Sequence, residues 1–200
     1  MLWLVPLLAL APSVEATSLP GSAEHLLEAS QRIHEATVTF VPPYCAGVVV
    51  GDGRRTLTAA HCVLAPDQPA MVALYDGRVA EGRWERIDTA QDVAVLVFEE
   101  PLPVRGLAVA EQLPAQGEVV LFCGRDGGPH TQVAAVERLG RCPSLPNVAQ
   151  ALFTTLRGYR GESGAPVVDL KLQVVGLVHG GAACNIATPT ATIASALKNP

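Results

Sequence analysis

The sequence predicts an all-β fold, and three observations support this. Short runs rich in valine and leucine recur from Ala36 onward, turn signals separate these runs, and charged residues make up only 16% of the chain beside 18 Gly and 16 Pro. Many short strands separated by turns at regular intervals are typical of antiparallel barrels or of a sandwich. A length of 200 residues suits one sizeable domain or two small barrels that share an interface.

An apolar stretch opens the chain. Residues 1–16 (MLWLVPLLALAPSVEA) are too few to span a bilayer, and Val14 and Ala16 place small side chains before a cleavage point. We interpret this stretch as a secretory signal peptide, with an uncleaved amphiphilic N-terminus or a lipid-facing anchor as the alternative. The interpretation predicts a secreted or periplasmic protein without membrane contact after removal of the signal.

A short amphipathic helix is expected next, within an N-terminal segment of residues 17–35. The stretch 22–35 contains no Gly or Pro. Its apolar residues stand at near-helical spacing. They are Leu26, Leu27 and Ile33.

The strand pattern occupies the rest of the chain. A proline-dotted stretch, residues 99–117, divides the strands into two sets, which we interpret as a first β-barrel over 36–104 and a second over 105–200. The expected strands are ATVTFV, AGVVV, RTLTA, MVALY, DVAVLVF, EVVLF, QVAAVERL, ALFTTL, PVVDL and QVVGLV.

A second helix is expected at the end of the chain. Thr190–Lys198 (TATIASALK) follows the last apolar runs and spaces Ile193 and Leu197 one helical turn apart. We expect these two side chains to face inward.

Composition excludes several function classes. The formal net charge is -5, and the sequence contains no run of Lys or Arg that could bind a phosphate backbone. Nucleic acid is therefore not an expected partner. No Cys-x-x-Cys and no helical pair of histidines is present, so we predict no metal and no cofactor. Five cysteines in an exported protein indicate disulfides, and the odd number leaves at least one without a partner in the chain.

Three short motifs carry chemistry: TAAHC around His61, QDVAVLVF around Asp92 and GESGAP around Ser163. Each alone has a plain structural explanation, because a single histidine or aspartate beside a strand more often packs or caps a turn. The serine motif also matches the elbow of α/β-hydrolases, but no βαβ alternation surrounds it. The chain order of the three is the more informative signal.

Together the motifs resemble the trypsin/chymotrypsin superfamily over residues 36–192. TAAHC matches the family's histidine motif fully, whereas GESGAP departs from the usual GDSGGP at Glu162 and Ala165. The resemblance implies two antiparallel six-stranded β-barrels of the chymotrypsin type. It also implies serine endopeptidase activity on polypeptides.

Hydrolysis of a peptide bond requires an activated nucleophile. In the roles that the resemblance implies, Ser163 attacks, His61 takes its proton, and a carboxylate orients the imidazole. Asp92 has that last role because it abuts the apolar strand, with Asp88 as the competing candidate. The oxyanion hole falls to the backbone amides of Gly161 and Ser163.

The resemblance implies a disulfide between Cys45 and Cys62, with two buried thiols as the alternative. Many family members pair a cysteine four residues before the serine with one near Cys184, but here that position is Tyr159. If Gly127 and Gly128 form the tip of a hairpin, Cys123 lies too far from Cys142 to pair with it. Cys142 is then the preferred partner of Cys184. The absence of an IVGG-like start also argues against activation by a newly cleaved N-terminus.

For the substrate pocket, the resemblance implies Arg157 near the floor, His179 close to the triad, and Gly180 and Gly181 at an open mouth. One interpretation is a positively charged pocket that favours Asp, Glu or small polar side chains. The other is that His179 only hydrogen-bonds Asp92 while Arg157 turns to solvent. Both predict no preference for Lys or Arg.

The leading hypothesis is a secreted serine endopeptidase that acts through an acyl-enzyme, with a polypeptide substrate and a protein inhibitor as candidate partners. A non-catalytic relative of the fold that binds a partner is the first alternative. An esterase is the second, because attack on an ester is easier than attack on an amide.

Overall fold

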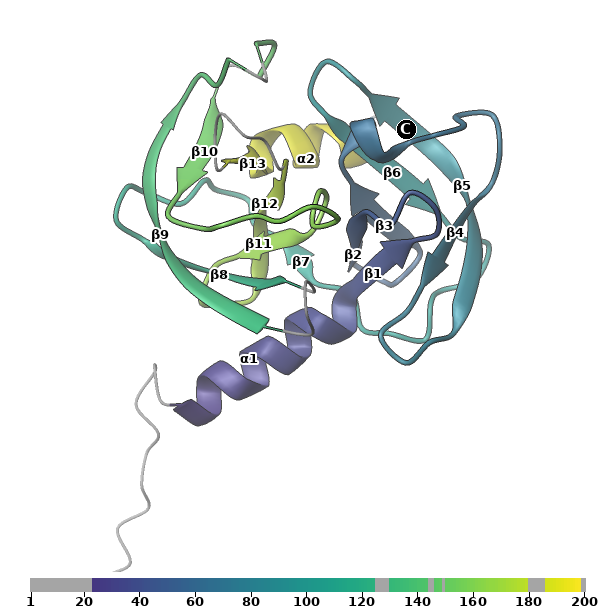
Figure 1. Ribbon diagram of the computed structural model, residues 1–200, viewed down its shortest axis with the longest axis horizontal. Coiled ribbons are helices and arrows are strands. Elements are labelled where there is room, and N and C mark those ends of the chain that lie inside the picture. Colours follow the sequence, from purple (N-terminus) through teal and green to yellow (C-terminus); the bar gives the residue numbers. More distant parts are fainter. Residues whose placement is uncertain (1–22, 125–129, 144–145, 149, 180–185, 199–200) are drawn as a thin grey trace, which may run out of the picture.

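The computed structural model describes residues 23–124, 130–143, 146–148, 150–179 and 186–198, and Figure 1 shows two β-rich halves joined by two helices in this part of the chain. The predicted signal peptide, residues 1–16, lies outside the described residues. Among the residues described, no helix is long and apolar enough to cross a membrane.

The first half is a closed barrel with strand order β1-β2-β3-β6-β5-β4, in which every neighbouring pair is antiparallel. Its interior is filled by apolar side chains such as Phe40, Leu96 and Phe98. The elements up to this point are α1 (Ala23–Ala36), β1 (Thr37–Phe40), β2 (Ala46–Val50), β3 (Arg55–Thr58), the 3-10 turn η1 (Ala60–Cys62), β4 (Ala70–Ala73), β5 (Val79–Asp88) and β6 (Val93–Val97).

The second half is a sheet in the order β11-β8-β9-β10-β13-β12-β7, and a further pairing of β11 with β12 closes its first six strands into a ring. β7 joins β12 in parallel, the one departure from the expected antiparallel pattern among the named strands described. The remaining elements are β7 (Ala108–Val109), β8 (Val119–Gly124), β9 (His130–Gly140), β10 (Ala151–Thr154), β11 (Pro166–Val168), β12 (Gln173–Val178), β13 (Ile186–Pro189) and α2 (Thr190–Lys198).

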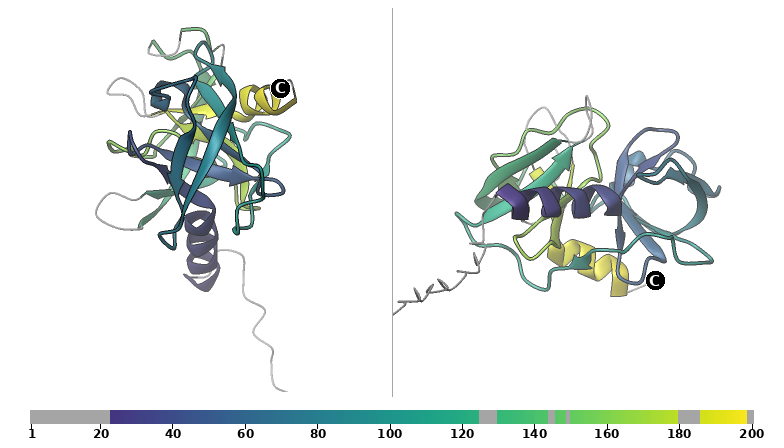
Figure 2. Two further views of the ribbon diagram at one scale, coloured as in Figure 1. Left: turned by 90° about the vertical axis from the view of Figure 1, so that its right-hand side faces the viewer. Right: turned by 90° about the horizontal axis from the view of Figure 1, so that it is seen from below.

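The two halves and both helices share one apolar core. α1 contacts β1 and β2 of the first barrel and β8 of the second, and Figure 2 shows it lying across both halves. α2 packs on β6 from the other side and on β7, β12 and β13. Burying side chains of this size contributes about 1.5–3 kcal/mol each, so the shared core holds the halves in a fixed relation. Its members include Ile33, Val50, Val95, Leu121, Leu177 and Ile193.

The helix predictions are confirmed with one difference. Ile193 is fully buried and Leu197 packs against the shared core, as expected. In α1 the buried residues are Ala29, Ile33 and Ala36, whereas Leu27 is 71% exposed. Spacings of four and three residues place the buried set on one face, and Leu27 falls outside it.

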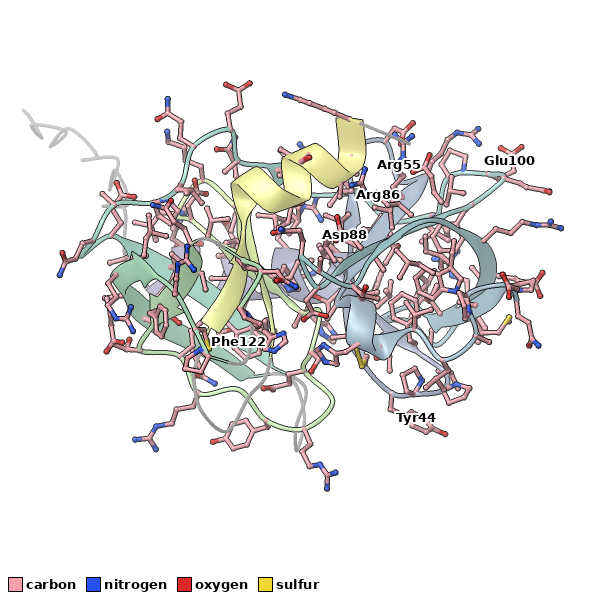
Figure 3. The ribbon with its side chains drawn as sticks, turned by 90° about the horizontal axis from the view of Figure 1, so that it is seen from above. Tyr44, Arg55, Arg86, Asp88, Glu100 and Phe122 are labelled. Carbon is pink, nitrogen blue, oxygen red and sulfur yellow. A yellow bond between two sulfur atoms is a disulfide. The ribbon has the colours of Figure 1, made fainter. Side chains whose placement is uncertain are left out.

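Aromatic side chains mark the inside and the outside of the two halves. Figure 3 shows Phe122 within the second sheet and Tyr44 extending away from the first barrel. Phe122 has no exposed surface, while Tyr44 is 66% exposed.

The strand order and the two helices confirm the predicted all-β fold, with a closed six-stranded barrel, a second sheet and two short helices.

Candidate active site

His61 lies on η1, directly after β3 of the first barrel. A disulfide between Cys45 and Cys62 ties this turn to the start of β2. Thr58, in the same motif, donates from its hydroxyl to the carbonyl of Ala46 at 2.7 Å. The turn is thus held on both sides, while the His61 side chain keeps 42% of its surface exposed.

Asp92 sits in the loop before β6 and is only 4% exposed. Its backbone has a φ of 53°, the left-handed region that Asp tolerates better than most residues. The carboxylate accepts the backbone N–H of His61 at 3.0 Å, and both its oxygens lie 3.0 Å from His61 Nδ1. It also accepts a short hydrogen bond from Nδ1 of His179.

The surroundings of Asp92 favour its ionised form. Burial alone would raise the pKa of this carboxyl, but the hydrogen bonds from His179 and then His61 outweigh burial and lower the pKa to about 2. A buried carboxylate that stays ionised at neutral pH can orient an imidazole and stabilise its protonated form.

Asp88, the competing candidate, has different partners. It pairs with Arg86 at 3.3 Å, and Figure 3 shows the two side chains together on the first barrel. It also accepts the backbone N–H of Gln91 at 2.9 Å, which caps the turn that leads to Asp92. Asp88 therefore shapes the loop, and the structure brings Asp92 to His61 instead.

Ser163 lies in a loop before β11 of the second half, and two glycines give the loop its shape. Gly161 has a φ of 92° and Gly164 a φ of 85°. A Cβ on Gly164 would collide with Ala46 of β2 and Thr58 of β3, so the Ser163 loop can lie against these strands only with glycine here. The carbonyl of Ser163 accepts from the backbone N–H of Ala46 at 2.9 Å.

The hydroxyl of Ser163 donates to the backbone carbonyl of His179 at 3.1 Å. Within the described part of the chain, no hydrogen bond joins it to His61. Among the described residues, the backbone N–H groups of Gly161 and Ser163 do not donate to any protein acceptor. These two amides are the donors that the sequence proposes for an oxyanion.

Glu162 is 3% exposed, and one of its carboxylate oxygens accepts the backbone N–H of Tyr159 at 2.6 Å. This contact joins the Glu162 side chain to its own loop. The sequence did not predict this contact, because the donor is the backbone N–H of Tyr159 and a backbone group has no signature in the sequence.

The pocket residues are placed only in part. Arg157 is exposed, and its backbone exchanges two hydrogen bonds with the Gln132 side chain, at 3.0 and 2.8 Å. His179 lies at the end of β12 and bonds Asp92. Gly180 and Gly181 lie outside the described residues. The two interpretations of the pocket, and the residue preference that each implies, therefore stay predictions.

The other cysteines lie in the second half. Cys142 is buried and disulfide-bonded, and its predicted partner, Cys184, lies outside the described residues. Cys123, in β8, is buried in the shared core.

His61, Asp92 and His179 could also form a metal-ligand set, because each offers a ligand atom within 4.8 Å of the others. The 3.0 Å separations between His61 Nδ1 and the Asp92 oxygens are hydrogen-bond lengths. These contacts form a network in which one carboxylate accepts from two imidazoles.

Comparison with known proteins decides the family. The model of the trypsin-like peptidase domain matches residues 45–177. The chain belongs to the trypsin-like peptidase family. The matched segment of this trypsin-like peptidase begins at Cys45 and includes His61, Asp92 and Ser163.

Two curated relatives are bacterial. HhoB of Synechocystis sp. is 32% identical over 139 residues, which cover 66% of this trypsin-like peptidase and 33% of HhoB. Serine protease Rv3671c of Mycobacterium tuberculosis is 28% identical over 159 residues, which cover 72% of this chain and 39% of that protein. The chain thus spans a third to two fifths of the length of these relatives.

Solved structures agree on the fold. The Rv3671c protease in its inactive form has a TM-score of 0.72 at 22% identity, over 90% of this chain and 96% of that one. The serine endoprotease of Yersinia pestis has the same TM-score and identity, over 90% of this chain and 67% of that one. At this identity the likeness establishes the fold of this trypsin-like peptidase, whereas activity depends on the residues of the site.

Proposed function

We propose that this protein is a secreted serine endopeptidase that hydrolyses peptide bonds through an acyl-enzyme on Ser163. The observation that carries the proposal is the buried Asp92 carboxylate, which accepts from Nδ1 of His61 through both oxygens at 3.0 Å. This bond leaves Nε2 of His61 as the proton acceptor. The 42% exposure of the His61 side chain leaves the ring accessible to a substrate.

The proposed reaction begins with a rotation of the Ser163 hydroxyl, away from the His179 carbonyl and toward Nε2 of His61. As the Ser163 oxygen bonds to the substrate carbonyl carbon, its proton passes to His61. The amides of Gly161 and Ser163 stabilise the oxyanion. The C–N bond then breaks, the amine leaves with the proton from His61, and water hydrolyses the ester by the same steps in reverse.

Two other functions would use the same fold. A non-catalytic binding protein has no need for an ionised, buried carboxylate shared by two imidazoles, since burial of a charge is costly without a purpose. An esterase would use the same groups, because only the leaving group differs.

Labelling with a serine-directed fluorophosphonate tests the proposal. We expect the mature protein to react once per chain, and Ser163→Ala to abolish the reaction. Ser195→Ala, which changes an exposed serine on α2, is the matched control and should label normally. A wild-type protein that resists labelling would favour the binding protein. Turnover of esters without any turnover of a peptide library would favour the esterase.

A further inference from the structure

An open cavity of about 640 Å³ lies where three distant segments of the chain meet, between α1 and the strand β7 that Figure 1 labels beside it. Arg32 comes from α1, Arg105 from the connection between the two halves, and Lys171 from the turn between β11 and β12. Arg105 and Lys171 are exposed, so a ligand in the cavity can reach their side chains. None of the described residues that line this cavity belongs to the proposed triad.

Positive charge dominates the lining of this cavity. Glu28 is the one carboxylate among the described residues that line it, so with His25 neutral the formal net charge of the lining is +2. In the described part of the chain, no carboxylate forms an ion pair with any of the three cations. Arginines elsewhere differ, since Arg55 pairs with a carboxylate at 2.7 Å. The cavity therefore holds positive charge that the rest of the described chain does not neutralise.

Arg32 shows the same excess of charge at a buried atom. Its Nη2 donates to the carbonyl of Gly106 at 3.1 Å, but its Nη1 is buried and has no acceptor among the residues described. Burial, and then the charge of Arg105, lower the pKa of Arg32, and Glu35 offsets only part of this effect. A buried donor on a charged group is costly when it is unpaired. An anion in the cavity would accept from Nη1 after a small turn of the guanidinium.

The backbone that carries these cations is fixed by contacts of its own. A Cβ on Gly106 would collide with the end of β2, and the N–H of Leu107 donates to the carbonyl of Val49 at 2.9 Å. In the turn after β11, the Asp169 carboxylate accepts the N–H of Lys171 at 2.9 Å. The positions of the cations are thus set before a ligand arrives, which lowers the entropic cost of binding.

We propose that this cavity is a binding site for a small soluble phosphate, free or as a monoester. A phosphate monoester carries close to two negative charges at neutral pH, which matches the charge of the lining. Cations that approach from three segments suit a tetrahedral set of acceptor oxygens, and the planar guanidinium of arginine binds two of them at once. The inference goes beyond the proposed function and does not depend on it, because binding is measured without a peptide substrate.

Calorimetric titration of the purified protein with inorganic phosphate and with glycerol 3-phosphate, at constant ionic strength, tests the proposal. We expect one site per chain, and Arg105→Gln and Lys171→Gln should each weaken binding about tenfold, the size of one hydrogen bond to a charged group. Arg83→Gln removes an exposed arginine of β5 outside the cavity and is the matched control, with unchanged affinity. Glu28→Gln should tighten binding, because it removes the one carboxylate of the lining.

Other outcomes would overturn the proposal. These are the absence of saturable binding to the wild type, equal weakening in Arg105→Gln and Arg83→Gln, and equal affinity for malonate, a dicarboxylate of the same charge. Retention on phosphatidic acid vesicles without binding of either soluble probe would assign the cavity to a lipid surface instead.

Thermal unfolding gives an independent readout of the same site. Phosphate should raise the midpoint of the wild type, because it binds the folded chain and bridges α1, the connection and the second half. Arg32→Lys keeps the charge but loses the planar fork, so this rise should shrink while the midpoint without phosphate stays close to that of the wild type. An equal rise in Arg32→Lys and the wild type would exclude Arg32 from the site and contradict the inference.

Discussion

Asp92 and Glu162 are both buried carboxylates, with 4% and 3% of their surface exposed, but they are held in different ways. Asp92 accepts from His61 and His179, which are 31 and 87 residues away in the chain. Glu162 accepts from the backbone of Tyr159, three residues before it. Asp92 thus accepts from both halves of the molecule, and the Tyr159 contact of Glu162 lies within one loop.

This difference separates chemistry from local architecture. The His179 contact of Asp92 exists only when the end of β12 in the second half lies beside the first half, whereas the His61 contacts of Asp92 lie within the first half. The contact of Glu162 can form within its own loop. We therefore expect changes at Asp92 to act mainly on turnover and on pH dependence, and changes at Glu162 to act mainly on stability.

The largest expected effect is kinetic. Asp92→Asn should lower kcat by about 10⁴-fold, because an amide favours the wrong tautomer of the imidazole. Asp88→Asn is the matched control, because asparagine keeps an acceptor oxygen for the Gln91 N–H that caps the loop and loses only the charge that pairs with Arg86, so kcat should stay nearly unchanged. Steady-state turnover of a peptide substrate measures both variants.

The same experiment contains a test of cooperation. Ser163→Ala and His61→Ala should each abolish most turnover, and the double variant should be little worse than either, because the two groups act as one unit. Clearly additive losses would count against the assignment of these residues.

The second effect concerns acid stability. Folding lowers the pKa of Asp92 from 3.8 to about 2, so its ionised form stabilises the protein at higher pH and this contribution is lost as the pH falls toward 2. We expect the wild type to lose about 2 kcal/mol more than Asp92→Asn between pH 5 and pH 2. Urea unfolding across this range measures the difference. Parallel curves for the two proteins would show that Asp92 is not held in its ionised form.

The sequence predicted the fold well where apolar residues alternate or run together. It missed β5, whose sequence VAEGRWERID is rich in charge and largely half-buried. Pairing with β4 on one side and β6 on the other holds this strand, and the Arg55 side chain of β3 bonds Glu85 at 2.7 Å. Barrel closure is a property of the whole sheet, so a local pattern does not reveal such a strand.

The candidate site was predicted in the same uneven way. Three motifs in order pointed to His61, Asp92 and Ser163, because each lies in a short segment of recognisable residue types. The choice between two roles for His179 stayed open, since its partner Asp92 is distant in sequence and only the packing of the halves brings them together. Local signals thus propose the groups, and the tertiary fold determines their partners.

The third effect is on stability at Glu162. Glu162→Ala should lower the free energy of unfolding by about 1–3 kcal/mol, because it removes the acceptor of the Tyr159 N–H and leaves a cavity. Glu162→Gln, which keeps an acceptor oxygen, should lose clearly less. If this contact takes the place of a newly cleaved N-terminus, a few residues added to the mature N-terminus should not reduce turnover. Complete loss of activity on such an extension would reject that explanation.

The smallest expected effect is at Arg157. Its side chain is exposed, and its backbone is held by Gln132, so the guanidinium has a solvated position rather than a buried one. Arg157→Ala should therefore leave the cleavage profile on a mixed peptide library nearly unchanged, whereas Gln132→Ala, which removes both backbone contacts, should disturb it more. Neither protein should prefer Lys or Arg before the scissile bond, because the GGAACN segment that follows His179 contains no carboxylate to attract a cation. Efficient cleavage after Arg would refute this expectation. An acidic preference that disappears in Arg157→Ala would show instead that Arg157 turns into the pocket when substrate binds.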